Sequence, residues 1–106
     1  MIHGVKGLVY HGNLHNGQFN GKGSITYPNG DVYTGEFKDN QKHGTGLYRY
    51  ANGDTYEGGY LKDVKEGKGT FQFSNCSKYV GEVHEGRYNG WGRLESQTGE
   101  TYDGMF

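Results

Sequence analysis

The stretch YTGEFKDNQKHGTGLYRYANGDT occupies residues 33–55, and its pattern recurs along the 106-residue chain. Its first tyrosine belongs to a series spaced 23 residues apart, and each member is followed two residues later by a glycine. The tyrosines are Tyr10, Tyr33, Tyr56, Tyr79 and Tyr102, and the glycines are Gly12, Gly35, Gly58, Gly81 and Gly104. A fixed period of this length indicates a repeat architecture. Repeat proteins usually present a long binding surface, not a single catalytic pocket.

The tyrosines divide the chain into four complete units, 10–32, 33–55, 56–78 and 79–101. Residues 1–9 are then expected to be the tail of a preceding unit, and residues 102–106 the start of a fifth. Apolar residues or glycine at unit positions 1, 3 and 5, and again at 14, 16 and 18, alternate with mostly polar residues. A period of two predicts strands with one apolar and one wet face. Each unit should therefore form two short strands.

Turn signals separate these strands. Asn29-Gly30 and Asn52-Gly53 lie between units and are strong hairpin signals. Within a unit, the residues from Asp39 to Gly44 are expected to form a longer loop that ends in glycine. Consecutive hairpins make an antiparallel meander, so the predicted fold is all-β: an elongated, twisted, single-layer solenoid of β-hairpins. Each unit should add about 10 Å and four units about 40 Å.

The glycine columns at positions 3 and 14 should leave the room that neighbouring aromatic rings fill. The third link between units carries Cys76 where the other links have glycine. A positive φ costs a non-glycine residue about 1 kcal/mol or more. We therefore expect the link between the third and fourth units to be the least regular, and to bend the array.

Composition restricts the function. Net charge is −1 with the two signs interspersed, which argues against a nucleic-acid arm. The single cysteine excludes an intrachain disulfide. The first residues lack the apolar run of a signal peptide, so a cytoplasmic location is expected. Gly21-Lys22-Gly23 and Gly67-Lys68-Gly69 lack the spacing of a phosphate loop, and no catalytic constellation stands out. Neither a cofactor nor an enzymatic activity is expected.

The aromatic stripe is the main candidate site. Its members are Tyr10, Tyr33, Phe37, Tyr48, Tyr56, Tyr60, Phe71 and Tyr79. These rings can serve simply as packing, or part of the stripe can remain an exposed groove, and exposed apolar patches usually mark interaction surfaces. We expect a groove that binds a helix or an extended segment of a partner protein. Leu47, Leu61 and Trp91 form a smaller second candidate on the other face. Cys76 and His84 could contribute to a zinc site between two chains.

The chain resembles the MORN repeat family. The resemblance rests on Tyr33-Thr34-Gly35-Glu36-Phe37, on Lys42-His43-Gly44-Thr45-Gly46, and on the later Asn52-Gly53. It implies an elongated β array that scaffolds proteins, dimerises end to end, or touches phospholipid, in a cytoskeletal or ciliary setting. The family histidine is present only as His43. The family's Gly-Glu pair is kept at Gly35-Glu36 and Gly81-Glu82.

Phospholipid binding is the alternative function. It favours a basic face, and Lys62, Lys65 and Lys68 are interrupted by Asp63 and Glu66. The chain begins and stops inside a unit, which is expected for a fragment of a longer array or for ends that pair with another chain. Homodimerisation or end-to-end assembly is therefore a further prediction.

Overall fold

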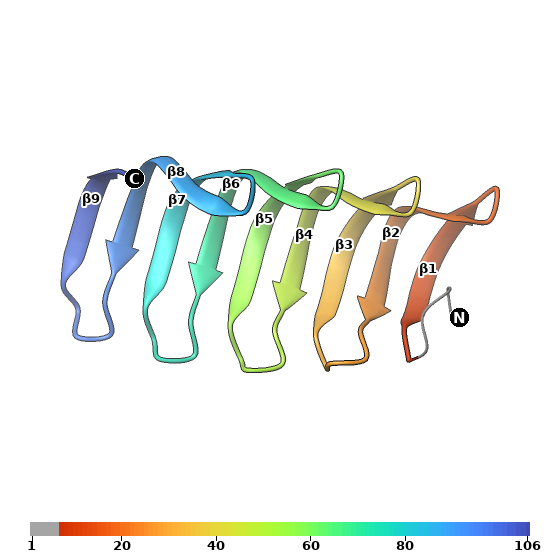
Figure 1. The fold of residues 1–106 in the computed structure, drawn as a ribbon, viewed down its shortest axis with the longest axis horizontal. Helices are drawn as coiled ribbons and strands as arrows, with labels where there is room; N and C mark the ends of the chain where they lie inside the picture. Colours follow the sequence, from red (N-terminus) through yellow and green to blue (C-terminus); the bar gives the residue numbers. More distant parts are fainter. Residues whose placement is uncertain (1–6) are drawn as a thin grey trace.

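The computed structural model describes residues 7–106 as one open antiparallel sheet whose nine strands follow in sequence order (Figure 1). The strands are β1 (Val9–His15), β2 (Gln18–Thr26), β3 (Val32–Lys38), β4 (Gln41–Arg49), β5 (Thr55–Leu61), β6 (Val64–Gln72), β7 (Lys78–His84), β8 (Arg87–Glu95) and β9 (Thr101–Met105). No helix occurs in these residues, and the sheet measures 47 × 24 × 17 Å. The predicted all-β meander is confirmed. Residues 1–6, part of the expected tail of a preceding unit, lie outside the described residues.

The turns within units lie side by side at one end of the strands, drawn uppermost in Figure 1. The predicted longer loop from Asp39 to Gly44 is wrong, because β3 and β4 are joined by Asp39 and Asn40 alone. Both residues are left-handed, with φ of 50° and 70°. Left-handed backbone at both central positions matches the twist of the flanking strands. Gly44, at φ 93°, lies inside β4 instead.

From the second unit onwards, each of these turns also bonds to the second strand of the unit before it. The backbone N–H of Asn40 donates to the Phe19 carbonyl at 3.0 Å, and the Asn40 side chain accepts from the Phe19 N–H at 2.7 Å. Asp63 and Lys42 repeat both bonds one unit later, at 2.9 and 2.8 Å. Each turn therefore satisfies backbone groups of the unit before it.

The links between units lie at the opposite end of the strands. The hairpins expected at the Asn-Gly pairs are present, with the Gly30 N–H donating to the Tyr27 carbonyl at 3.0 Å. Only Gly30 of the Asn29-Gly30 pair has a positive φ, at 97°. The carboxylate of Asp31 then accepts from the Ala51 N–H of the next link at 2.8 Å.

The expectation of an irregular third link is wrong. Cys76 does adopt φ 76°. Its N–H nevertheless donates to the Phe73 carbonyl at 2.9 Å, which repeats the bond of the other links. The register of β6 with β7 is continuous from Gly67 to Gln72. The difference is chemical, since Ser77 occupies the place of Asp31 and lacks the carboxylate that bridges links.

A row of glycines crosses the whole sheet at right angles to the strands. One glycine from each strand is paired with the next across all nine strands: Gly12, Gly23, Gly35, Gly46, Gly58, Gly69, Gly81, Gly92 and Gly104. A methyl group on Gly23 would lie 2.5 Å from the Tyr10 hydroxyl oxygen. The row thus provides the space that the tyrosine rings occupy, as the sequence predicts.

The repeat tyrosines form the core above this row. Tyr33 is fully buried, and its hydroxyl donates to the Glu36 carbonyl at 2.8 Å. Its ring meets Phe37 and Tyr60 edge to face, with centroids 5.0 and 5.2 Å away. Edge-to-face pairs of this kind add about 0.5–1.5 kcal/mol beyond burial. The core of this thin sheet is therefore a ladder of rings on one face.

Candidate functional site

Most of the predicted groove residues lie beneath the surface. Tyr10, Tyr33, Tyr56 and Tyr79 are at most 1% exposed, and Phe37 and Tyr60 are 5% exposed. Their rings are covered by neighbouring side chains, so these six do not form an open groove; of the six, Tyr60 also lines a pocket, which is described below. Tyr48 and Phe71, the other two, are partly exposed.

We call the surface above this buried layer the aromatic face. It consists of six partly exposed rings: Tyr27, Tyr48, Tyr50, Phe71, Phe73 and Tyr88. Neighbouring rings contact one another, with centroids of Tyr48 and Tyr50 4.6 Å apart and those of Phe71 and Tyr88 5.2 Å apart. Two depressions open on this face. One has a volume of about 340 Å³ and is lined by Phe71, Phe73, Gly86, Arg87 and Tyr88.

The second depression, the central pocket, lies between the second and third units and has a volume of about 350 Å³. It is lined by Lys42, Tyr48, Tyr50, Tyr60, Asp63, Val64, Lys65 and Gly86. Its side chains come from two successive units, 33–55 and 56–78, and the backbone of Gly86 in the turn after β7 adds a contact from the next unit. It combines two amines with three phenol rings.

The lysines of the central pocket hold their amines against aromatic rings. Lys42 Nζ lies 5.7–5.8 Å from the ring centroids of Tyr27, Tyr33 and Tyr60. Lys65 Nζ lies 5.3–5.6 Å from those of Tyr48, Tyr50 and Tyr56. Amines at such distances are attracted by the ring quadrupole. Phenol rings therefore hold both cations in place on the aromatic face.

The two lysines differ in their polar partners. The Lys42 side chain is only 15% exposed, and its amine lies 3.3 Å from Asp63 Oδ1 and donates to the Tyr27 hydroxyl at 3.2 Å. Lys65 forms no ion pair with any residue from 7 to 106. Lys42 thus has a carboxylate within ion-pair distance, whereas Lys65 has only the longer-range attraction of Asp31, whose pKa it lowers.

A phenol hydroxyl in the same pocket also lacks a partner. Among the described residues, Tyr60 is 5% exposed and its hydroxyl makes no hydrogen bond. A buried hydroxyl without a partner costs about 1–3 kcal/mol. Burial, more than any nearby charge, raises the pKa of Tyr60 well above 10. The group therefore stays protonated and can donate a hydrogen bond.

The neighbouring phenols are already engaged. Tyr48 donates to Asp31 Oδ2 at 2.7 Å, and burial followed by this bond raises the pKa of Tyr48. The same bond is the main cause that lowers the pKa of Asp31. Burial raises the pKa of Tyr56 to about 12. Asp31 is thus an ionised, fully bonded carboxylate at the margin of the aromatic face.

Comparison with known proteins agrees with this architecture. A model of the MORN repeat matches residues 10–32, 33–55, 56–75 and 79–101. The chain belongs to the MORN repeat family. MORN repeats generally mediate interactions with proteins or membrane lipids and are not typically enzymatic. No curated protein sequence matches the chain.

The Gly-Glu pair of the MORN pattern has a structural explanation here. Glu36 Oε1 accepts from the Thr45 N–H at 2.8 Å, and Glu82 Oε1 accepts from the Trp91 N–H at 2.7 Å. In both units the carboxylate satisfies a backbone donor just beyond the left-handed glycine of the paired strand. This glutamate stabilises the irregular part of the hairpin.

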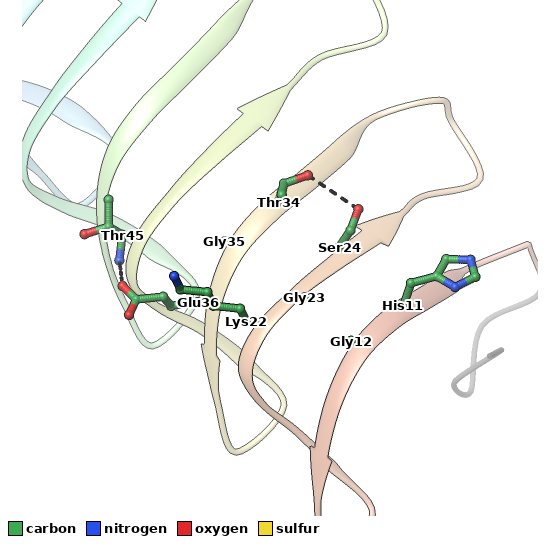
Figure 2. A pocket seen from close by; sticks show the side chains of 9 residues that line it. All are labelled: His11, Gly12, Lys22, Gly23, Ser24, Thr34, Gly35, Glu36 and Thr45. Carbon is green, nitrogen blue, oxygen red and sulfur yellow. Dashed lines mark hydrogen bonds between the residues drawn. The ribbon is translucent and has the colours of Figure 1, made fainter.

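Another depression lies on the opposite, polar face of the MORN array (Figure 2). Its volume is about 600 Å³, and the glycine row forms its floor. Figure 2 shows Ser24 and Thr34 on one side of the glycine backbones and Lys22 and Glu36 on the other. Thr34 bonds to Ser24 at 3.4 Å, and Glu36 is held by Thr45. This trough has no buried polar side chain without a partner, so the central pocket is the better ligand site.

The remaining candidates lie apart from the aromatic face. Trp91 and Leu61 are 65% and 48% exposed. Cys76 precedes β7 and His84 is its last residue, so the two lie at opposite ends of this strand. Within residues 7–106, no three potential metal ligands gather. The same residues contain no helix that could cross a membrane.

Sequence reasoning missed the column that carries Lys42 and Lys65. This is unit position 10, which holds Phe19 in the first unit and Tyr88 in the fourth. The sequence predicts a loop here, and in a loop the alternation of apolar and polar residues does not indicate which side chains share a face. A 23-residue spacing between the two lysines, in a column otherwise aromatic, is the signal that would have found them.

Proposed function

We propose that this MORN array is a non-enzymatic scaffold module that binds a segment of a partner protein along the aromatic face. The observation that carries the proposal is the pair of partly exposed ring clusters, Tyr27 with Tyr48 and Tyr50, and Phe71 with Phe73 and Tyr88, each bordering a depression. Tyrosine and phenylalanine offer large contact areas with few rotatable bonds, and tyrosine is a frequent anchor of protein interfaces.

The distribution of lysines supports a protein partner more than a membrane surface. Lys62 lies in a turn, Lys65 lies on the aromatic face, and Lys68 borders a depression on the polar face. An anionic membrane contributes about 1 kcal/mol for each basic residue near its surface. Lysines spread over three places cannot all approach one membrane, and the net charge of −1 adds no general attraction.

Photo-crosslinking from the two faces tests the proposal. A crosslinking phenylalanine derivative placed at Tyr50 or Phe73 should capture a partner from lysate that is then identified by mass spectrometry. The matched control places the same group at Trp91 or Val80, which are 65% and 44% exposed on the polar face. Capture of the same protein from the polar face alone would place the interface there and contradict the proposal.

Vesicle co-sedimentation tests the alternative. The chain should not pellet with anionic vesicles at physiological salt. Strong pelleting that weakens as salt rises would favour phospholipid binding.

Self-association is a second part of the proposal. Within the described residues β9 pairs only with β8, and its Tyr102 is 52% exposed. Open strand edges readily pair with another strand. Light scattering over a concentration series should show growth in mass, and a constant monomer mass would contradict this part. A cytoplasmic, cytoskeletal or ciliary setting is also proposed, and microscopy of the tagged protein tests it.

A further inference from the structure

We infer that the central pocket binds a carboxylate side chain, so that the protein segment bound on the aromatic face carries a glutamate or aspartate where it crosses β4 to β6. This inference rests on the proposed function and specifies the chemistry of the partner. It derives from three donors that the pocket brings together: the amines of Lys42 and Lys65 and the hydroxyl of Tyr60.

The first argument is the unmatched hydroxyl. Tyr60 is buried, lines the pocket, and has no hydrogen-bond partner among residues 7–106. The nearby hydroxyls of Tyr27 and Tyr48 are occupied, by Lys42 and Asp31. A ligand that supplies an acceptor oxygen would remove this cost of about 1–3 kcal/mol.

The second argument is the balance of charge. Asp63 matches Lys42, whereas Lys65 has no carboxylate within ion-pair distance among the described residues. Asp31 lies near enough for Lys65 to lower its pKa, but its oxygens already accept from Tyr48 and Ala51. Among the residues that line the pocket, the positive charges therefore exceed the negative by one. A carboxylate neutralises this charge and forms charge-assisted hydrogen bonds, which are about twice as strong as neutral ones.

The third argument distinguishes a carboxylate from a phosphate. A phosphate monoester carries nearly two negative charges, as phosphorylated side chains do. Asp63 already lies in the pocket, 3.3 Å from the Lys42 amine, and would repel the second charge. A single negative charge fits the excess of one.

The position of the pocket also predicts the pattern of the ligand. Residue 10 of the units is Phe19 and Tyr88 on either side of the lysines, and these rings stack on Tyr10 and Tyr79 at 3.8 and 4.0 Å. On one side Phe19 is buried, and on the other the depression is lined by Phe71, Phe73 and Tyr88 together with Arg87. The acidic side chain should lie in the middle of the bound segment, with apolar side chains towards the depression at Phe73.

Peptide selection tests the inference. A phage library of random peptides of about 12 residues, which span about 40 Å when extended, is selected on the full chain. The binders should share one glutamate or aspartate flanked by apolar residues. Their affinity for the K42Q/K65Q variant should fall about tenfold or more, as should that of peptides whose acidic residue is replaced by the amide.

A matched control removes two other lysines. K62Q/K68Q makes the same change in net charge away from the pocket, and affinity should stay within about twofold of wild type, as expected for exposed charges. Tyr60→Phe removes only the hydroxyl and should weaken binding about threefold or more, because a neutral hydrogen bond is lost. Circular dichroism and thermal unfolding confirm that each variant is folded.

The outcomes separate the inference from the proposed function. Binders that are lost on Tyr50→Ala but indifferent to K42Q/K65Q would overturn the acidic specificity and leave the aromatic face as the binding surface. Binders indifferent to both variants, or selection of no peptide, would overturn the proposed function and the inference with it. Vesicles of phosphatidylcholine with about 30% phosphatidylserine provide the last arm. Pelleting that K42Q/K65Q abolishes, without binding of acidic peptides, would overturn the inference in favour of a lipid headgroup.

Discussion

The two central units and the two flanking units share one backbone but present different chemistry. Units 33–55 and 56–78 have the same strand lengths and glycine row as units 10–32 and 79–101. At position 10 the flanking units stack an aromatic ring on the repeat tyrosine, whereas the central units place a lysine there. The comparison teaches that constant columns build the scaffold and a single variable column sets what its surface can recognise.

The largest expected effect concerns the shared scaffold. Tyr33→Ala in a central unit removes a fully buried ring and should lower the free energy of unfolding by about 3–5 kcal/mol. Tyr102→Ala, at a ring that is 52% exposed, should cost about 1 kcal/mol or less. Urea unfolding followed by circular dichroism measures both. Equal decreases in the free energy of unfolding would show that burial of a repeat tyrosine does not determine how much it stabilises the fold.

Exchange at position 10 tests the difference between the units. Phe19 is 3% exposed, so Phe19→Lys should destabilise by about 2–4 kcal/mol through the loss of apolar burial. The reverse change, Lys65→Phe, should leave stability unchanged or raise it by about 0.5–1.5 kcal/mol through a new ring contact. Chemical denaturation of both variants is the measurement. Marked destabilisation by Lys65→Phe would mean that the lysine is required for folding and not for recognition.

A smaller effect on stability is expected at Cys76, in the link between the central unit 56–78 and the flanking unit 79–101. Cys76 has φ 76°, where the other links use glycine. Cys76→Gly should therefore stabilise the chain by about 0.4–1 kcal/mol by relieving this conformation. Gly53→Ala, at φ 99°, is the control and should destabilise. A loss of stability in Cys76→Gly would show that the thiol makes a contribution that outweighs backbone strain.

The smallest effect is a pH dependence at the same boundary. His84 Nδ1 lies 2.7 Å from Glu66 Oε2, and this hydrogen bond raises the pKa of His84 above 6.5 and lowers that of Glu66 below 4.5. The contribution of His84 to the free energy of unfolding is complete below pH 6.5 and is lost as pH rises through its pKa in the folded state. The contribution of Glu66 to the free energy of unfolding is complete above pH 4.5 and is lost as pH falls through its pKa in the folded state.

The pair therefore stabilises most between these values. His84→Gln should lower the unfolding midpoint more at about pH 5.5 than at about pH 8. Nuclear magnetic resonance titration should show the His84 pKa falling towards 6.5 in the Glu66→Gln variant. An unchanged His84 pKa in that variant would exclude this pairing in solution.

Much of the fold could be predicted because its signals are local. Because side chains alternate between the two faces of a strand, Tyr33 and Phe37 share one face regardless of which residues surround them. The turn at Asp39 and Asn40 could not be predicted in the same way, because neither residue is glycine. That turn is held by bonds to Phe19, 20 or more residues away. Lys62 and Asp63 adopt the same left-handed pair with still less local preference.

The candidate site could be predicted only in part for a related reason. The stripe of rings is visible in the sequence, but burial depends on how tightly adjacent units pack. The sequence predicts that Tyr60 contacts a partner directly, but in the structure its ring packs against Tyr33 and Tyr56 and its hydroxyl is buried, although the residue lines the pocket. Lys62, Lys65 and Lys68 are close together in the sequence, but the structure places them in a turn, on the aromatic face and on the polar face.

By itself the sequence determined the 23-residue unit, the strand parity and the glycine columns, because each depends on residues within one unit. Tertiary structure alone decided which rings are covered and where the amines lie. The central pocket joins Tyr50, Tyr60 and Gly86 from three different units. Their meeting depends on the register and twist of strands that are adjacent in space, which no single unit specifies.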